Sequence, residues 1–283
     1  MNFGDLPETH TKFAESQIVI LPVPYDGTST WLKGANKGPQ AILEASANLE
    51  LYDIETDSEV YLQGIHTLKP VTEATTPESM YTAVLTSVIS LINQKKFIVT
   101  IGGEHSISTG AIEAHAQNFN DLTVLQLDAH ADLRPEYDGS KYNHACVMSR
   151  VNELGLPFTQ VGIRSMDVSE KKQLKAEKTF FAKDIVKQLN WQKKIIPTLS
   201  QNVYITIDLD VFDPAIMPST GTPEPGGLDW WSVLELLRLV AQNRNIVGFD
   251  LVELCPDPNH KAPDFLAAKL IYKLLSYKFG EIK

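Results

Sequence analysis

Short apolar runs alternate with longer segments of helical periodicity along most of the 283-residue chain. The runs predict strands buried on both faces, because a half-exposed strand would alternate polar and apolar residues. These strands are expected at residues 17–24, 97–101, 122–128, 159–163, 179–181, 203–209 and 246–252. The periodic segments predict helices at 39–46, 76–94, 106–118, 145–154, 168–177, 229–242 and 262–278, with a helical region at 183–199.

Strands separated by helices indicate parallel pairing with helices on both faces of the sheet. The predicted fold class is therefore α/β, with three layers (α/β/α) around a central, mostly parallel sheet. Residues 1–16 are predicted to form an N-terminal arm. Because no linker, repeat or low-complexity tract follows, residues 17–283 are predicted to form a single catalytic domain.

Composition narrows the classes of partner. Hydrophobic residues make up 43% of the chain and charged residues 21%, as in globular proteins, and the formal net charge is −10. Nucleic acid is not an expected partner, because phosphate binding needs concentrated Lys and Arg. No apolar stretch approaches the roughly 18 residues of a membrane span, and the N-terminus lacks a signal-peptide pattern. We expect a cytoplasmic protein that does not bind membranes, with Cys146 and Cys255 reduced.

Metal-ligand residue types gather at the ends of three predicted strands. Alternate residues of a strand point to the same face, so side chains spaced by two converge there. The carboxyl ends of parallel strands are also where open α/β sheets bind ligands. The candidates are His105, Asp128, His130, Asp132, Asp208 and Asp210.

Charge balance predicts two metal ions. Four carboxylates carry a charge of −4, which two divalent cations would neutralise. Oxygen-rich ligation with two imidazoles favours Mn²⁺, although Zn²⁺, Fe²⁺ or Co²⁺ could substitute. Two close cations acidify a bridging water, so metal-assisted hydrolysis is the expected reaction class.

The order and spacing of five motifs resemble the arginase/agmatinase (ureohydrolase) family. The motifs are Gly102–His105, Asp128–Asp132, Asp208–Pro214, Ser219–Pro223 and Phe249–Glu253. The resemblance implies a three-layer α/β/α fold and two Mn²⁺ ions per chain, held by the six residues above. It also implies hydrolysis of a guanidinium group to urea and an amine, in a homo-oligomer (trimer or hexamer).

The resemblance also implies roles for four catalytic or substrate-binding residues. Glu253 would pair with the substrate guanidinium, a geometry that favours two parallel hydrogen bonds. A metal-bridging hydroxide would attack the guanidinium carbon, while Asp132 bonds the hydroxide and passes its proton onward. His144 would shuttle protons to the departing amine or to bulk water, and Thr222 would orient the substrate.

The loop 133–143 decides which small cationic guanidino substrate is expected. Arg134 stands where arginases carry an asparagine, and Ala145 replaces a glycine, so L-arginine is disfavoured. Glu136 or Asp138 could meet the ammonium of agmatine, and the loop looks most like those of bacterial and archaeal agmatinases. We therefore expect hydrolysis of agmatine to putrescine and urea, a step of polyamine biosynthesis. Arg134 could instead pair with the carboxylate of guanidinobutyrate, and aminopropylagmatine is a third candidate.

Two other classes of protein are alternatives. A deacetylase-like amidohydrolase with a single zinc ion shares the fold and the Asp-x-His strand end. The additional Asp132 and Asp210 favour two metals instead. A binding protein with a relic site is disfavoured because every expected ligand is present.

Overall fold

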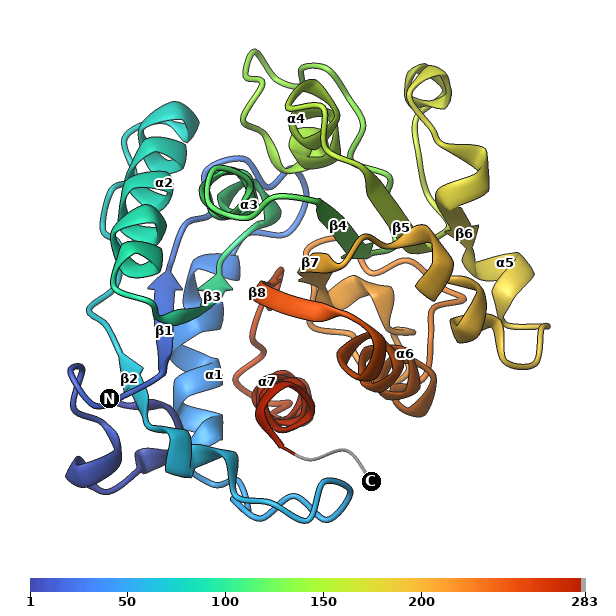
Figure 1. Cartoon of the computed structure of the whole chain (residues 1–283). Helices are drawn as coiled ribbons and strands as arrows, with labels where there is room; N and C mark the ends of the chain where they lie inside the picture. Colours follow the sequence, from blue (N-terminus) through green and yellow to red (C-terminus); the bar gives the residue numbers. More distant parts are fainter. Residues whose placement is uncertain (281–283) are drawn as a thin grey trace.

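The computed structural model describes residues 1–280, so the last three residues of the predicted domain 17–283 lie outside the described part. One sheet of eight parallel strands runs through the molecule in the order β2-β1-β3-β8-β7-β4-β5-β6 (Figure 1). The strands are β1 Ile18–Val23, β2 Ile65–Thr67, β3 Phe97–Gly102, β4 Leu122–Leu127, β5 Phe158–Ile163, β6 Thr179–Phe181, β7 Asn202–Asp208 and β8 Asn245–Val252. The predicted parallel α/β architecture is confirmed.

Helices cover both faces of this sheet. They are α1 Gly38–Ser46, α2 Pro77–Asn93, α3 Ser108–Ala116, α4 Val147–Glu153, α5 Ala182–Ile185, α6 Trp230–Asn243 and α7 Ala262–Phe279. Helices α2, α3 and α4 lie on one face, and α1, α6 and α7 lie on the other (Figure 1). The sheet therefore forms the middle of three layers.

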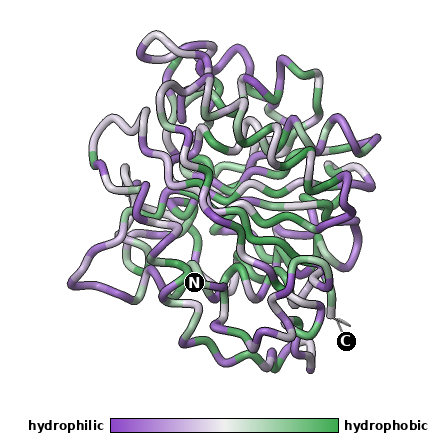
Figure 2. Tube along the Cα trace, turned by 90° about the vertical axis from the view of Figure 1, so that its left-hand side faces the viewer, coloured by the Kyte–Doolittle hydropathy of each residue, from purple (hydrophilic) through white to green (hydrophobic). Residues whose placement is uncertain are grey.

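Each face of the sheet has its own hydrophobic cluster. Ile20 of β1 belongs to the cluster that includes residues of α1, α6 and α7, whereas its neighbour Leu21 belongs to the cluster that includes residues of α2, α3 and α4. This division follows from the alternation of side chains along a strand. Figure 2 shows the hydrophobic segments gathered in the central strands, with hydrophilic segments mostly at the periphery. Burial on both faces explains why the strands read as apolar runs.

Local sequence determines where the longer helices begin. Thr76 caps α2, since its hydroxyl accepts a hydrogen bond from the Ser79 amide at 3.1 Å, and Pro77 occupies the first turn. Asp229 caps α6 in the same way, accepting from the Ser232 amide at 3.0 Å. These caps satisfy amides that have no partner within the helix.

Two predicted helical regions are mostly 3₁₀ turns. The region 168–177 contains the 3₁₀ helix Val168–Lys172, and the region 183–199 contains only the short α5 followed by 3₁₀ turns. Asn190 has a left-handed backbone (φ 56°), which interrupts a continuous helix in that region. Strand β2 was not predicted, because its sequence Ile-His-Thr has a single apolar residue, whereas the equally short β6 contains two phenylalanines.

The N-terminal 16 residues pack against the domain. Phe3 is fully buried, and its amide donates to the Thr67 hydroxyl at 2.9 Å, next to β2. Among residues 1–280, no helix has both the length and the apolar character needed to cross a membrane.

Candidate metal centre

The candidate site lies at the carboxyl ends of four neighbouring central strands, β3, β8, β7 and β4. His105 follows β3, Glu253 follows β8, Asp208 ends β7 and Asp128 follows β4. The amide of His105 donates to Glu253 Oε1 at 2.7 Å, although the two residues are 148 positions apart. Parallel pairing therefore brings distant segments to a single edge of the sheet.

The first group of ligand-type atoms surrounds His105. Its Nδ1 lies 2.9 Å from Asp132 Oδ2, 3.2 Å from Asp128 Oδ2 and 3.5 Å from Asp208 Oδ2. All four side chains are buried. His105, Asp128 and Asp132 each offer an atom within the mutual distance expected of ligands to one ion.

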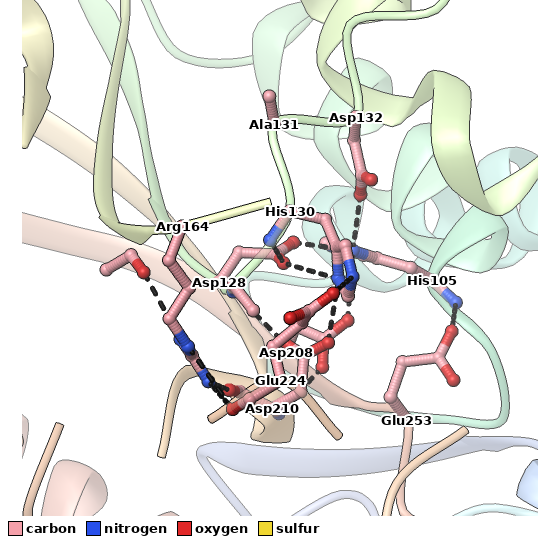
Figure 3. A network of polar contacts seen from close by, with 12 residues as sticks. His105, Asp128, His130, Ala131, Asp132, Arg164, Asp208, Asp210, Glu224 and Glu253 are labelled. Carbon is pink, nitrogen blue, oxygen red and sulfur yellow. Dashed lines mark hydrogen bonds and ion pairs between the residues drawn. The ribbon is translucent and has the colours of Figure 1, made fainter. Parts of the chain in front are cut away.

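The second group adjoins the first through Asp128. His130 Nδ1 lies 2.8 Å from Asp210 Oδ2 and 3.7 Å from Asp128 Oδ1. The two oxygens of Asp128 thus face different histidines. Figure 3 shows the side chains of both groups converging. The structure brings together all six residues that the sequence singled out. Five of them form two groups that could each hold a metal ion, and Asp208 lies beside the first group.

The hydrogen bonding of His105 fits a metal ligand. Its Nδ1 is buried and has no hydrogen-bond partner of acceptable geometry among the described residues. Its Nε2 lies 2.8 Å from the Thr206 hydroxyl, which donates to Asp250 Oδ1 at 2.7 Å. Because the single hydroxyl hydrogen goes to Asp250, the Thr206 oxygen accepts Nε2–H. This leaves the Nδ1 lone pair directed at the carboxylates, as a metal-binding imidazole requires.

Without metal, protons compete for the same atoms. Burial lowers the pKa of His130, but the negative charges of Asp210 and Asp128 outweigh this effect and raise the pKa to about 12. Burial and the charge of Asp128 raise the pKa of Asp132 to about 7, and burial raises the pKa of Asp208 well above its usual range. A divalent ion would replace these protons, so metal affinity is expected to rise with pH.

We expect bound Mn²⁺ to raise the melting temperature by a larger amount as pH rises. The pKa of Asp132 is about 7 in the folded protein and about 3.9 when unfolded, so its proton stabilises the fold fully below about pH 4. This stabilisation is lost as pH rises through about 7, and the raised pKa of His130 acts in the same direction above about 6.5. Melting temperatures with EDTA and with Mn²⁺ should therefore diverge between about pH 5 and pH 8. Mn²⁺ at 100 times its Kd would raise the midpoint by roughly 5–10 °C.

Restoring Mn²⁺ to the EDTA-treated sample is the control for irreversible damage. A gap between the two melting curves that stays constant or narrows with rising pH would contradict this account of the site.

Two site residues have a left-handed backbone. Asp132 has φ 52° and Glu253 has φ 68°, a conformation that costs about 1–3 kcal/mol for a residue other than glycine. Their neighbours hold them there: the Asp132 carbonyl accepts from the Met148 amide at 2.9 Å, and the Glu253 amide donates to the Gly103 carbonyl at 2.8 Å. These hydrogen bonds at the strand ends therefore offset the backbone strain.

A cavity of about 280 Å³ opens onto the two groups. Glu253, His144, Thr222 and Arg134 line it together with five of the six ligand-type residues, and Asp128 lies buried beneath. These four are predicted substrate-binding or catalytic residues. The structure therefore brings them to the same cavity, and their roles stay predictions.

The structure places Glu136 and Asp138 outside the cavity lining, on the exposed part of the loop. Asp138 (φ 47°) and Gly139 (φ 77°) form the tip of a tight turn. Backbone hydrogen bonds between Tyr137 and Ser140 close this turn at 3.0 and 3.1 Å. The turn directs the two carboxylates to solvent and brings Tyr137 to the cavity wall instead. The contact of either acid with a substrate ammonium stays a prediction.

Arg134 already has partners at the cavity mouth. Its guanidinium carbon lies 4.4 Å from the centre of the Tyr137 ring, and Nη2 lies 4.0 Å from Asp167 Oδ2. Its charge therefore faces a carboxylate, which leaves it less available for the carboxylate of a guanidino acid.

His144 is neutral at physiological pH. Burial lowers its pKa to about 4, and the nearby charges of His105 and His130 add to this effect. A neutral imidazole has one nitrogen able to accept a proton, as a shuttle requires.

Fold and site together define a class: three-layer α/β/α proteins with a carboxylate-rich site for divalent ions at the strand ends. A sequence profile of the arginase family matches residues 16–276. The chain belongs to the arginase family.

Individual relatives are similar over nearly their whole length. The chain is 41% identical to the N(1)-aminopropylagmatine ureohydrolase of Synechocystis sp., over 97% of this chain and 92% of the relative. It is 38% identical to the protein of the same name from Thermus thermophilus, over 96% and 93%. The crystal structure of the agmatine ureohydrolase of Thermoplasma volcanium superposes with a TM-score of 0.86 at 33% identity, covering 95% of this chain and 92% of that one. The resemblance and the enzyme class predicted from the sequence are confirmed.

Proposed function

We propose that this chain is a ureohydrolase with two Mn²⁺ ions that cleaves the guanidinium group of a linear guanidino amine into urea and an amine. The observation that carries the proposal is the pair of His/Asp groups, joined by Asp128, at the base of a cavity that Glu253 also lines. When bound, the two ions would lower the pKa of a water molecule and supply the nucleophile near neutral pH.

Glu253 is assigned to bind and orient the guanidinium. Its Oε1 accepts from the His105 amide, and its Oε2 has no hydrogen-bond partner among the described residues. A carboxylate oxygen directed at the substrate would form charge-assisted hydrogen bonds with the guanidinium N–H groups. Because Glu253 is fixed by the strand end, the guanidinium carbon would be held against the metal groups.

Asp132 and His144 are assigned to proton transfer. Asp132 lines the cavity beside His105, where its carboxylate would accept a hydrogen bond from the attacking water and take its proton. His144 lines the same cavity and, being neutral, can accept a proton and release it to the departing amine nitrogen.

We infer that aminopropylagmatine is the preferred substrate and agmatine the second. The relatives from Synechocystis and Thermus carry the first name, and the Thermoplasma structure carries the second. The cavity mouth also suits an aliphatic chain, because Trp31 and Leu32 line it and are 69% and 44% exposed. Arg134 is already engaged with Asp167 and Tyr137, so it is not a free partner for an amino-acid carboxylate.

Urea release with Mn²⁺ should rank the substrates. We expect kcat/KM for aminopropylagmatine to exceed that for agmatine by roughly 10-fold or more, a difference typical of a few added apolar contacts. L-Arginine and 4-guanidinobutyrate should be poorer still, since their carboxylates would face an acidic cavity. An enzyme that releases urea from neither amine would refute the proposed function.

A further inference from the structure

The Thr28 hydroxyl lies between a buried carboxylate and the cavity-lining histidine. Its Oγ1 is 2.9 Å from Glu104 Oε1 and 3.0 Å from His144 Nδ1, and it also accepts the His144 amide at 3.0 Å. Glu104 is fully buried and belongs to neither metal group. Thr28 lies in the loop after β1, Glu104 follows β3, and His144 begins the 3₁₀ turn before α4, so their contact depends on the folded site.

Backbone amides that donate to Glu104 show which atoms donate and which accept in the contacts of Thr28 with Glu104 and His144. Glu104 Oε1 accepts the Thr28 amide at 3.3 Å, and Oε2 accepts the Ser106 amide at 2.7 Å. An amide can only donate, so both carboxylate oxygens act as acceptors. The Thr28 hydrogen therefore points to Glu104, and its oxygen lone pairs face His144. The hydrogen between Thr28 and His144 must then be on Nδ1.

We propose that Thr28, oriented by Glu104, is a positioning residue that holds His144 as its Nδ1–H tautomer and so presents an unprotonated Nε2 to the cavity. The inference deepens the proposed function, because the shuttle role of His144 belongs to that function. Nε2 accepts the proton that Asp132 has taken from the attacking water, and the resulting imidazolium is stabilised by Nδ1–H donating to Thr28. Nε2 then gives the proton to the departing amine nitrogen, which restores the neutral ring.

Backbone contacts hold the loop that carries Thr28 close to Glu104. The Tyr25 carbonyl accepts the Glu104 amide at 2.9 Å, and a Cβ atom at Gly103 would lie 1.8 Å from that carbonyl oxygen. Only glycine allows this approach. Farther along, Asp26 Oδ2 accepts the Gly34 amide at 2.6 Å and closes the loop on itself. Gly103 therefore allows the close contact between the segments after β1 and β3, as well as the turn into the next helix.

The test compares Thr28→Val, which loses the hydroxyl at nearly constant volume, with Thr28→Ser, which keeps it. The histidine tautomers are read by two-bond ¹H–¹⁵N correlation spectra of the full-length chain loaded with diamagnetic Zn²⁺. We expect the His144 proton on Nδ1 in the wild type and in Thr28→Ser, and a shift toward Nε2–H in Thr28→Val. Thr86→Val, on the exposed side of α2, is the matched control.

Steady-state kinetics with Mn²⁺ supplies the second readout. Thr28→Val should lower kcat by about 10-fold or more and change KM far less. The loss in kcat is smaller than the roughly 10²–10⁴-fold that a positioned acid–base group contributes, because His144 itself remains. Thr28→Ser should restore most of the loss. A wild-type His144 protonated on Nε2, or a Thr28→Val variant with unchanged tautomer and kcat, would overturn the inference. Failure of the wild type to release urea from any guanidino amine would instead overturn the proposed function, because the tautomer is read without turnover.

Discussion

Asp128→Asn is expected to reduce urea formation by at least about 10³-fold, as when one member of a catalytic unit is removed. Asp128 is the residue that both metal groups share: Oδ2 lies 3.2 Å from His105 Nδ1, and Oδ1 lies 3.7 Å from His130 Nδ1. Asparagine replaces one of these oxygens with an amide nitrogen and removes a negative charge. Both changes weaken the binding of two divalent cations. Urea release and bound manganese per chain should fall together.

The matched control is Asp184→Asn, an exposed aspartate on α5 outside the cavity lining. It loses the same charge and should keep full activity and metal content. An Asp128→Asn variant that retains two manganese ions and wild-type turnover would exclude the binuclear interpretation.

Glu253→Gln is expected to lower kcat/KM by roughly 10²–10³-fold, the range for a lost electrostatic contact in a preorganised site. Glutamine keeps the volume and can still accept the His105 amide, which Glu253 does at 2.7 Å. It cannot supply the negative charge that pairs with a guanidinium. Because Glu253 is in neither metal group, manganese content should stay near that of the wild type.

Glu235→Gln on α6 provides the comparison for Glu253→Gln. Glu235 forms a surface ion pair with Arg238 at 2.7 Å, and such pairs contribute only about 0–1 kcal/mol. Its activity should be unchanged. Unaltered kcat/KM in Glu253→Gln would remove Glu253 from the binding site.

The sheet and the metal groups were predictable because burial and ligation leave strong patterns. Strands such as β3 and β7 are covered on both faces, so their apolar runs stand out without an alignment. The ligand-type residues follow these runs directly, and parallel pairing then brings them to a single edge. Strand β2 was not predicted because its three residues do not form an apolar run.

The surroundings of the metal groups were not predictable, because they depend on which side chains meet across the fold. Thr206 and Asp250 lie in buried strands and appear in the sequence as isolated polar residues. In the structure, Thr206 donates to Asp250 and accepts from His105 Nε2, which orients the imidazole. A buried aspartate in an otherwise apolar strand was the available signal for Asp250. Glu136 and Asp138 were predicted as substrate contacts from their charge and from the likeness of the loop to those of agmatinases. The tight turn at Asp138, which exposes both side chains, was not predictable from the sequence.

The order of the central strands has a consequence for how the chain folds. Strands β3 and β8 are neighbours in the sheet, and His105 and Glu253, which follow them, are 148 positions apart in the chain. Strands β4 and β7 lie between them in sequence. Contacts between residues so far apart in sequence form slowly, because the chain loses the entropy of loop closure before the contacts stabilise it. The first metal group lies within residues 105–132, but the second needs Asp210, so the two groups are complete together only after β7 has joined the sheet. Recovery of urea release after refolding should therefore lag behind recovery of helical signal.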